Sequence, residues 1–157
     1  MEEPKRLERA IVIFDSKYGN TEGVAKSLAD GFQKAGLETS CFNIKEVKTE
    51  TLSSYDLIAV GAPTQAFSAS KPMKDFLEQL ENVEGLKGKQ GFAFDTKLAS
   101  RLSGSAGKYI ENKLSKLGLE IAKPRESAIV KKSEGPLEEG EHESFERLGF
   151  EIGSNLT

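Results

Sequence analysis

The sequence predicts an α/β fold, a doubly wound five-stranded parallel sheet with helices on both faces. Short apolar runs rich in β-branched residues alternate along the chain with longer segments whose apolar residues recur at helical spacing. Such an alternation is typical of parallel strands joined by helical crossovers. The length of 157 residues suits one domain of ordinary size, so we expect a single domain over residues 1–157.

Each predicted element rests on its own stretch of sequence. Residues 9–14 are mostly apolar and end at Asp15, which predicts a short buried strand. Apolar residues at helical spacing predict a helix over 20–35, and Gly36 ends it. The other predicted strands are 37–44, 55–61, 88–95 and a fifth built from 119–122 and 127–130, interrupted by Pro124. The other predicted helices begin at Pro72, run over 103–117, and run over 138–156.

Composition excludes several kinds of chemistry. The net charge is −3 and no basic stripe occurs, so we expect no nucleic-acid partner. No apolar run approaches the ~20 residues of a membrane span, and the N-terminus lacks the apolar stretch of a signal peptide. We therefore expect a cytoplasmic protein that does not contact a membrane. A single cysteine, Cys41, and a single histidine, His142, exclude an internal disulfide and metal sites built from clusters of these residues.

The loop after the first predicted strand is a candidate phosphate site. Parallel strands leave a crevice at their carboxyl ends, and this loop lies there, between a buried strand and the start of a helix. A helix N-terminus presents unpaired amides and a partial positive charge. Ser16 and Thr21 add hydroxyl groups, and Gly19 lets the backbone approach an anion closely. On the local pattern alone, an ordinary turn with Asn20 or Thr21 as the helix N-cap fits equally well.

Residues 12–21 resemble the flavodoxin signature, in which the loop reads Thr-x-Thr-Gly-Asn-Thr. Tyr18 stands where a second threonine is common, and Lys17 is either a cation beside the phosphate or a solvated side chain. The resemblance covers nearly the whole chain and implies a flavodoxin-like fold with strand order 2-1-3-4-5 and FMN as cofactor. The matching positions are Ser16, Gly19, Asn20 and Thr21.

The loop after the third predicted strand is expected to hold one face of the flavin. Pro63 stiffens it, Thr64 offers a hydroxyl, and Phe67 offers a stacking face or is a core residue under a helix. Flavodoxins have an aromatic residue and a glycine where this chain has Gln65 and Ala66. In flavodoxins a carbonyl near that glycine turns toward flavin N5. Alanine disfavours the required positive φ by roughly 1 kcal/mol.

The loop after the fourth predicted strand is expected to hold the other flavin face. The resemblance implies that the backbone amides of Asp95, Thr96 and Lys97 bind the pyrimidine carbonyl oxygens, and that Leu98 supplies an aliphatic face. The matching loop of flavodoxins often carries a tyrosine, which this loop lacks. Lys97 or Arg101 near flavin N1 would favour the anionic reduced form and raise the potential. We expect Ser103 to cap the helix that follows.

These interpretations lead to one function and two alternatives. The first is an electron carrier that exchanges electrons with redox partner proteins, a reductase and an acceptor. Its chemistry would belong to FMN, and no residue would be catalytic. The second is an FMN-dependent oxidoreductase acting on a quinone or another small acceptor, which the unusual segment 65–67 leaves open. The third is a binding or regulatory module without cofactor. The sequence does not define the oligomeric state.

Overall fold

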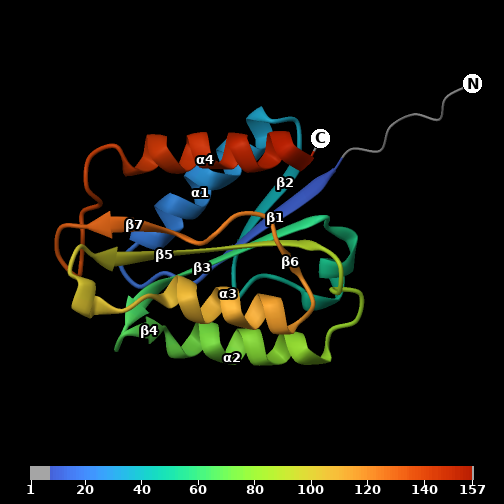
Figure 1. Ribbon diagram of the computed structural model, residues 1–157, viewed down its shortest axis with the longest axis horizontal. Helices are drawn as coiled ribbons and strands as arrows, with labels where there is room; N and C mark the ends of the chain where they lie inside the picture. The colour runs from blue at the N-terminus through green and yellow to red at the C-terminus, as the bar shows by residue number, and fades with distance from the viewer. Residues whose placement is uncertain (1–7, 157) are drawn as a thin grey trace, which may run out of the picture.

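A computed structural model describes residues 8–156, apart from the side chain of Arg101. Two helices cover each face of one sheet (Figure 1). Helices α1 (Asn20–Lys34) and α4 (Glu141–Leu156) lie on one face, and α2 (Lys71–Gln79) and α3 (Ala106–Lys116) lie on the other. Three short 3₁₀ helices complete the helical elements of the described chain. They span Thr49–Ser54, Leu80–Asn82 and Arg101–Ser103.

The order of the main strands is β2-β1-β3-β5, and all of their pairings are parallel. Both β6 and β7 pair with β5, one at each end of that strand. This is the predicted order 2-1-3-4-5, with the fifth strand in two pieces on either side of Pro124, so the predicted fold is confirmed. The parallel strands are β1 (Arg9–Phe14), β2 (Glu38–Asn43), β3 (Leu57–Gln65), β5 (Gln90–Leu98), β6 (Glu120–Ile121) and β7 (Glu126–Val130).

Two predicted strands continue further than the sequence indicated. Strand β5 runs to Leu98 rather than Asp95, because β7 pairs with it up to that residue. Strand β3 runs to Gln65 rather than Gly61, because β5 accompanies it to Pro63 and a short antiparallel strand, β4 (Ser68–Ala69), pairs with its end. The carbonyl of Gly61 accepts from the amide of Asp15, so the backbone of Gly61 faces β1. The backbone of Pro63, two residues further along β3, faces the same side. Strand β1 has already ended there, and the missing N–H of proline leaves no ladder bond unmade.

Each face of the sheet has its own hydrophobic core. Side chains alternate along β1, so Ile11 and Ile13 pack beneath α2 and α3, whereas Val12 packs beneath α1 and α4. Helices α1 and α4 approach so closely that glycine is required at their crossing. A Cβ on Gly31 would lie 2.1 Å from the carbonyl oxygen of Glu146. The core layers therefore hold α1, and with it the loop that precedes it, in a fixed position over the sheet.

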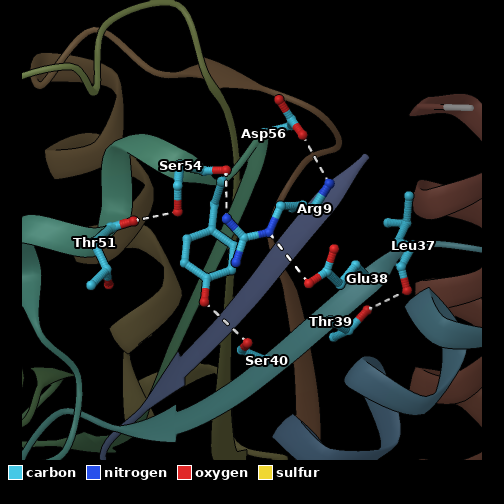
Figure 2. Close-up of polar contacts among 9 residues, drawn as sticks. Arg9, Leu37, Glu38, Thr39, Ser40, Thr51, Ser54 and Asp56 are labelled. Atoms are coloured by element: carbon cyan, nitrogen blue, oxygen red, sulfur yellow. Dashed lines mark hydrogen bonds and ion pairs between the residues drawn. The ribbon is translucent and has the colours of Figure 1, made fainter. Parts of the chain in front are cut away.

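The start of β1 is fixed by contacts of Arg9 (Figure 2). Its backbone N–H donates to Asp56 Oδ2 at 2.8 Å, and its guanidinium donates to the carbonyl of Ser54 at 3.2 Å. The guanidinium also lies 4.6 Å from the ring centroid of Tyr55 and 3.7 Å from Glu38 Oε1. These contacts tie β1 to its neighbours at the edge of the sheet opposite the carboxyl ends of the strands.

Candidate functional site

A cleft of about 370 Å³ opens at the carboxyl ends of β1, β3 and β5. All three predicted loops contribute to its walls. The predicted site residues that line it are Ser16, Lys17, Tyr18, Asn20, Thr21, Pro63, Thr64, Gln65, Thr96, Lys97 and Leu98. The remaining predicted residues, Gly19, Ala66, Phe67 and Asp95, are not among its lining residues.

The loop before α1 holds the helix N-terminus open toward the cleft. The N-cap is Gly19, at φ 92°, rather than Asn20 or Thr21, and no side chain caps the helix from this position. Ser16 Oγ instead accepts from the amides of Gly19 and Glu22, at 3.1 and 3.3 Å. Among residues 8–156, no group accepts a hydrogen bond from the amides of Asn20 and Thr21. Two donors at the positive end of a helix are therefore available to an anion.

The N-terminus of α3, at the same edge of the sheet, is closed by side chains. Thr64 Oγ1 accepts from the amide of Ala106 at 3.0 Å, and Asp95 Oδ2 accepts from that of Gly107 at 2.8 Å. Ser105, rather than the predicted Ser103, is the N-cap and accepts from the third amide. The carboxylate of Asp95 is thus buried as a helix cap, and Asp95 is not among the lining residues of the cleft. The expectation that its backbone amide contacts the flavin stays a prediction.

A buried pair of hydroxyl groups joins the first turn of α1 to the end of β5. Thr21 Oγ1 and Thr96 Oγ1 lie 2.8 Å apart, and their residues are 1% and 4% exposed. Thr96 can reach α1 because side chains alternate along β5, which places its neighbour Asp95 on the α3 side. Either threonine can donate, so the pair keeps one further hydroxyl hydrogen for a ligand.

The second loop is a tight hairpin between β3 and β4. Gln65 pairs with Ser68, which leaves Ala66 and Phe67 as a two-residue turn with φ of 47° and 70°. Both residues occupy the left-handed region, which costs an L-residue other than glycine about 1–2 kcal/mol. The side chain of Phe67 is 71% exposed, so the alternative of a core residue is wrong. Gly104 lets the chain pass close to the turn, since a Cβ there would lie 2.2 Å from the Phe67 carbonyl oxygen.

The side chains around the mouth of the cleft combine apolar surface with positive charge. Tyr18 is 51% exposed, and the ammonium of Lys17 lies 5.3 Å from the centroid of its ring. Leu98, at the end of β5, is also exposed and lines the cleft. Lys17 and Lys97 both line the cleft, and no carboxylate or imidazole is among the lining residues of the described chain. The cleft therefore attracts anions although the protein as a whole is acidic.

Three further lining residues were not predicted: Ser103, Val130 and Ser133. Val130 and Ser133 belong to the end of β7 and the segment after it, a fourth loop at the same edge of the sheet. The position of the fifth strand was the signal that identifies this loop, because every carboxyl end in a parallel sheet faces the same crevice. Because the predicted fifth strand is interrupted at Pro124, the loop after it was not recognised as part of the site.

Other residues singled out in the sequence lie away from the cleft. Cys41, on β2, is half-buried, and burial raises the pKa of its thiol to about 11. His142 is exposed and shares a hydrogen bond with Ser27 at 2.9 Å. Within residues 8–156, no group of histidine, cysteine or acidic side chains could hold a metal ion. The same part of the chain contains no helix with the length and apolar character needed to cross a membrane.

One family model and several curated proteins match the sequence. The sequence model described as "Flavodoxin" matches residues 12–147. The chain is 33% identical over 86 residues to a flavodoxin of Clostridium saccharobutylicum, across 54% of this chain and 53% of that protein. It is 27% identical over 111 residues to NAD(P)H dehydrogenase (quinone) 3 of Rhizobium meliloti (strain 1021), across 56% and 52% of the two chains. The chain thus spans about half the length of these curated relatives.

Solved structures match over nearly the full chain. A flavodoxin from the domain Archaea superposes with a TM-score of 0.82 at 26% identity, covering 94% of this chain and 98% of that one. Oxidised flavodoxin 1 from Bacillus cereus has the same TM-score at 23% identity, covering 96% and 100%. The second likeness shows the shared fold.

Proposed function

This chain belongs to the flavodoxin family, whose cofactor is FMN, and we propose on that premise that it carries electrons between a reductase and an acceptor protein. FMN supplies the redox chemistry when bound. The observation that carries the proposal is the contrast between two helix ends at the edge of the sheet. The end of α1 offers open amides in the cleft, whereas the end of α3 is closed by Thr64, Asp95 and Ser105.

The phosphate of FMN would bind at the loop before α1. The amides of Asn20 and Thr21 supply donors, and Ser16 keeps its hydroxyl hydrogen because its oxygen only accepts within the loop. Lys17 adds a positive charge nearby. A phosphate at a helix N-terminus is favoured by both the free N–H groups and the helix dipole.

The flavin ring would lie between the ends of β3 and β5. Tyr18 and Leu98 offer apolar surface there, and Gln65 offers an amide that can both donate and accept. Lys97 would stabilise negative charge on the reduced ring and so raise the potential.

Titration of the purified apoprotein with FMN, riboflavin and FAD tests this proposal, with quenching of flavin fluorescence as the signal. We expect FMN to bind at least 100-fold more tightly than riboflavin, because only FMN carries the phosphate. Stepwise reduction of the complex, followed by its visible spectrum, should show reversible uptake of electrons. Equal affinities for FMN and riboflavin would contradict a phosphate site at α1, and no binding of either would contradict the function.

The relatives that are NAD(P)H dehydrogenases (quinone) favour a second candidate, a quinone reductase. The two candidates differ in whether the FMN-loaded protein oxidises NAD(P)H by itself. A quinone reductase loaded with FMN oxidises NAD(P)H and reduces a soluble quinone without another protein, whereas a carrier needs a reductase. The cytoplasmic location, the single-domain organisation and the individual contacts to FMN stay predictions.

A further inference from the structure

We propose that Ser133, on the loop after β7, forms part of the phosphate site and donates its hydroxyl to the phosphate of FMN. This inference rests on the proposed function and adds to it a residue from outside the three loops of the flavodoxin resemblance. Its basis is the position of one small hairpin, residues 131–136, against the loop before α1.

The hairpin 131–136 is a closed structure. The amide of Lys131 donates to the carbonyl of Pro136 at 2.9 Å, and the amide of Gly135 donates to that of Lys132 at 2.9 Å. A bridge between Val130 and Leu137 closes its base. Ser133 and Glu134 therefore form a tip whose backbone is fixed by its own hydrogen bonds.

The tip packs directly on the loop before α1. Asn20 Nδ2 donates to the carbonyl of Glu134 at 3.1 Å. Gly135 lies against the same side chain, since a Cβ on it would be 2.6 Å from Asn20 Oδ1. Asn20 also provides one of the two open amides of α1, so the tip sits beside the end of the cleft where an anion would bind.

Ser133 lines the cleft together with Ser16, Asn20 and Thr21. It is exposed, and no hydrogen bond within the described chain occupies its hydroxyl. A serine hydroxyl that faces an anion forms a charge-assisted hydrogen bond, which is stronger than one between neutral groups. The side chain of Asn20 holds the tip that carries Ser133 in place through its hydrogen bond to the carbonyl of Glu134. The backbone amide of Asn20 is one of the two open donors of α1.

The test compares the affinities of wild type and Ser133→Ala for FMN and for riboflavin, which has no phosphate. We expect the variant to bind FMN about tenfold more weakly, which corresponds to about 1.4 kcal/mol, and to bind riboflavin within twofold of wild type. Ser133→Thr keeps the hydroxyl and should retain FMN affinity within about threefold. Ser144→Ala removes an exposed serine on α4, outside the cleft, and is the matched control with no expected change.

The outcomes separate this inference from the proposed function. Equal weakening for FMN and riboflavin would place Ser133 against another part of the ligand and overturn the inference. Unchanged affinity for FMN would overturn it as well. In both cases wild type still binds FMN, and the proposed function stands. Failure of wild type to bind FMN would instead contradict the function itself and the inference with it.

Discussion

Thr21 Oγ1 lies 2.8 Å from Thr96 Oγ1, and this buried hydroxyl pair links the start of α1 to the end of β5 across 75 residues of sequence. Replacing Thr96 by valine keeps the shape of the side chain but leaves the Thr21 hydroxyl buried without its partner. We expect the free energy of unfolding to fall by about 1–3 kcal/mol, as measured by urea denaturation of the apoprotein.

The double variant Thr21→Val with Thr96→Val is the control for that pair. Removing both hydroxyl groups leaves no unpaired polar atom, so the double variant should be more stable than Thr96→Val alone. Additive losses from the two substitutions would show that the hydroxyl pair contributes nothing beyond its separate members.

Ala66 is expected to lower the free energy of unfolding, because it adopts a φ of 47° that glycine tolerates better. Ala66→Gly should raise the free energy of unfolding by about 0.5–1 kcal/mol, the strain relieved less the larger entropy of glycine in the unfolded chain. Urea denaturation measures this change. Ala62→Gly, in the buried part of β3, is the matched control and should destabilise. A loss of stability for both variants would rule out strain at the turn.

Two glycine-to-alanine substitutions on α1, where it packs against α4, should change the free energy of unfolding in opposite directions. Gly31→Ala places a methyl group against the backbone of α4, which cannot yield, and should cost about 2 kcal/mol or more. Gly23→Ala meets only the edge of the exposed His142 ring at 3.0 Å, and should gain about 0.5–1 kcal/mol of helix propensity. Thermal unfolding of the two variants compares them, and similar melting temperatures would contradict the close crossing.

Cys41 should react slowly in the native protein. Burial raises the pKa of its thiol from 9.0 to about 11, and the thiolate is the reactive form. Two pKa units correspond to a roughly 100-fold smaller thiolate fraction at pH 8, so alkylation by iodoacetamide should be about 100-fold slower than in urea-unfolded protein. The native rate should rise about tenfold per pH unit up to pH 10. Mass spectrometry follows the reaction, and equal rates in both states would refute the shift.

The same shift predicts how stability depends on pH above neutrality. The folded protein holds the Cys41 proton more tightly than the unfolded chain does, so the contribution of this thiol to stability is fully present below pH 9. It is lost as the pH rises toward about 11. Cys41→Ser, which does not titrate in this range, should show a smaller decline when urea denaturation is repeated across this interval.

The order of the elements could be predicted because hydrophobic periodicity is a local property of the sequence. The ends of β3 and β5 could not, because their last residues are strand only where another strand pairs with them. Pro63 illustrates this, since proline is typical of loops and is tolerated here only because β1 has already ended.

The cleft was predicted more accurately than the roles of its individual residues. The rule that ligands bind at the carboxyl ends of parallel strands identified three loops that line it. Asp95 turns toward α3 and Thr96 toward α1 because both residues lie within β5, where side chains alternate. The sequence predicted that this strand ends at Asp95, so the opposite directions of the two side chains could not be predicted. Ser133 was missed because its loop follows a strand in two pieces.

The closed end of α3 has a consequence for how a ligand enters. Of the two helices that follow β1 and β5, only α1 offers free amides to a negatively charged tail, since Thr64, Asp95 and Ser105 already accept hydrogen bonds from those of α3. Between these two helices, we therefore expect an elongated molecule with one anionic terminus to bind in a single orientation, with that terminus at α1.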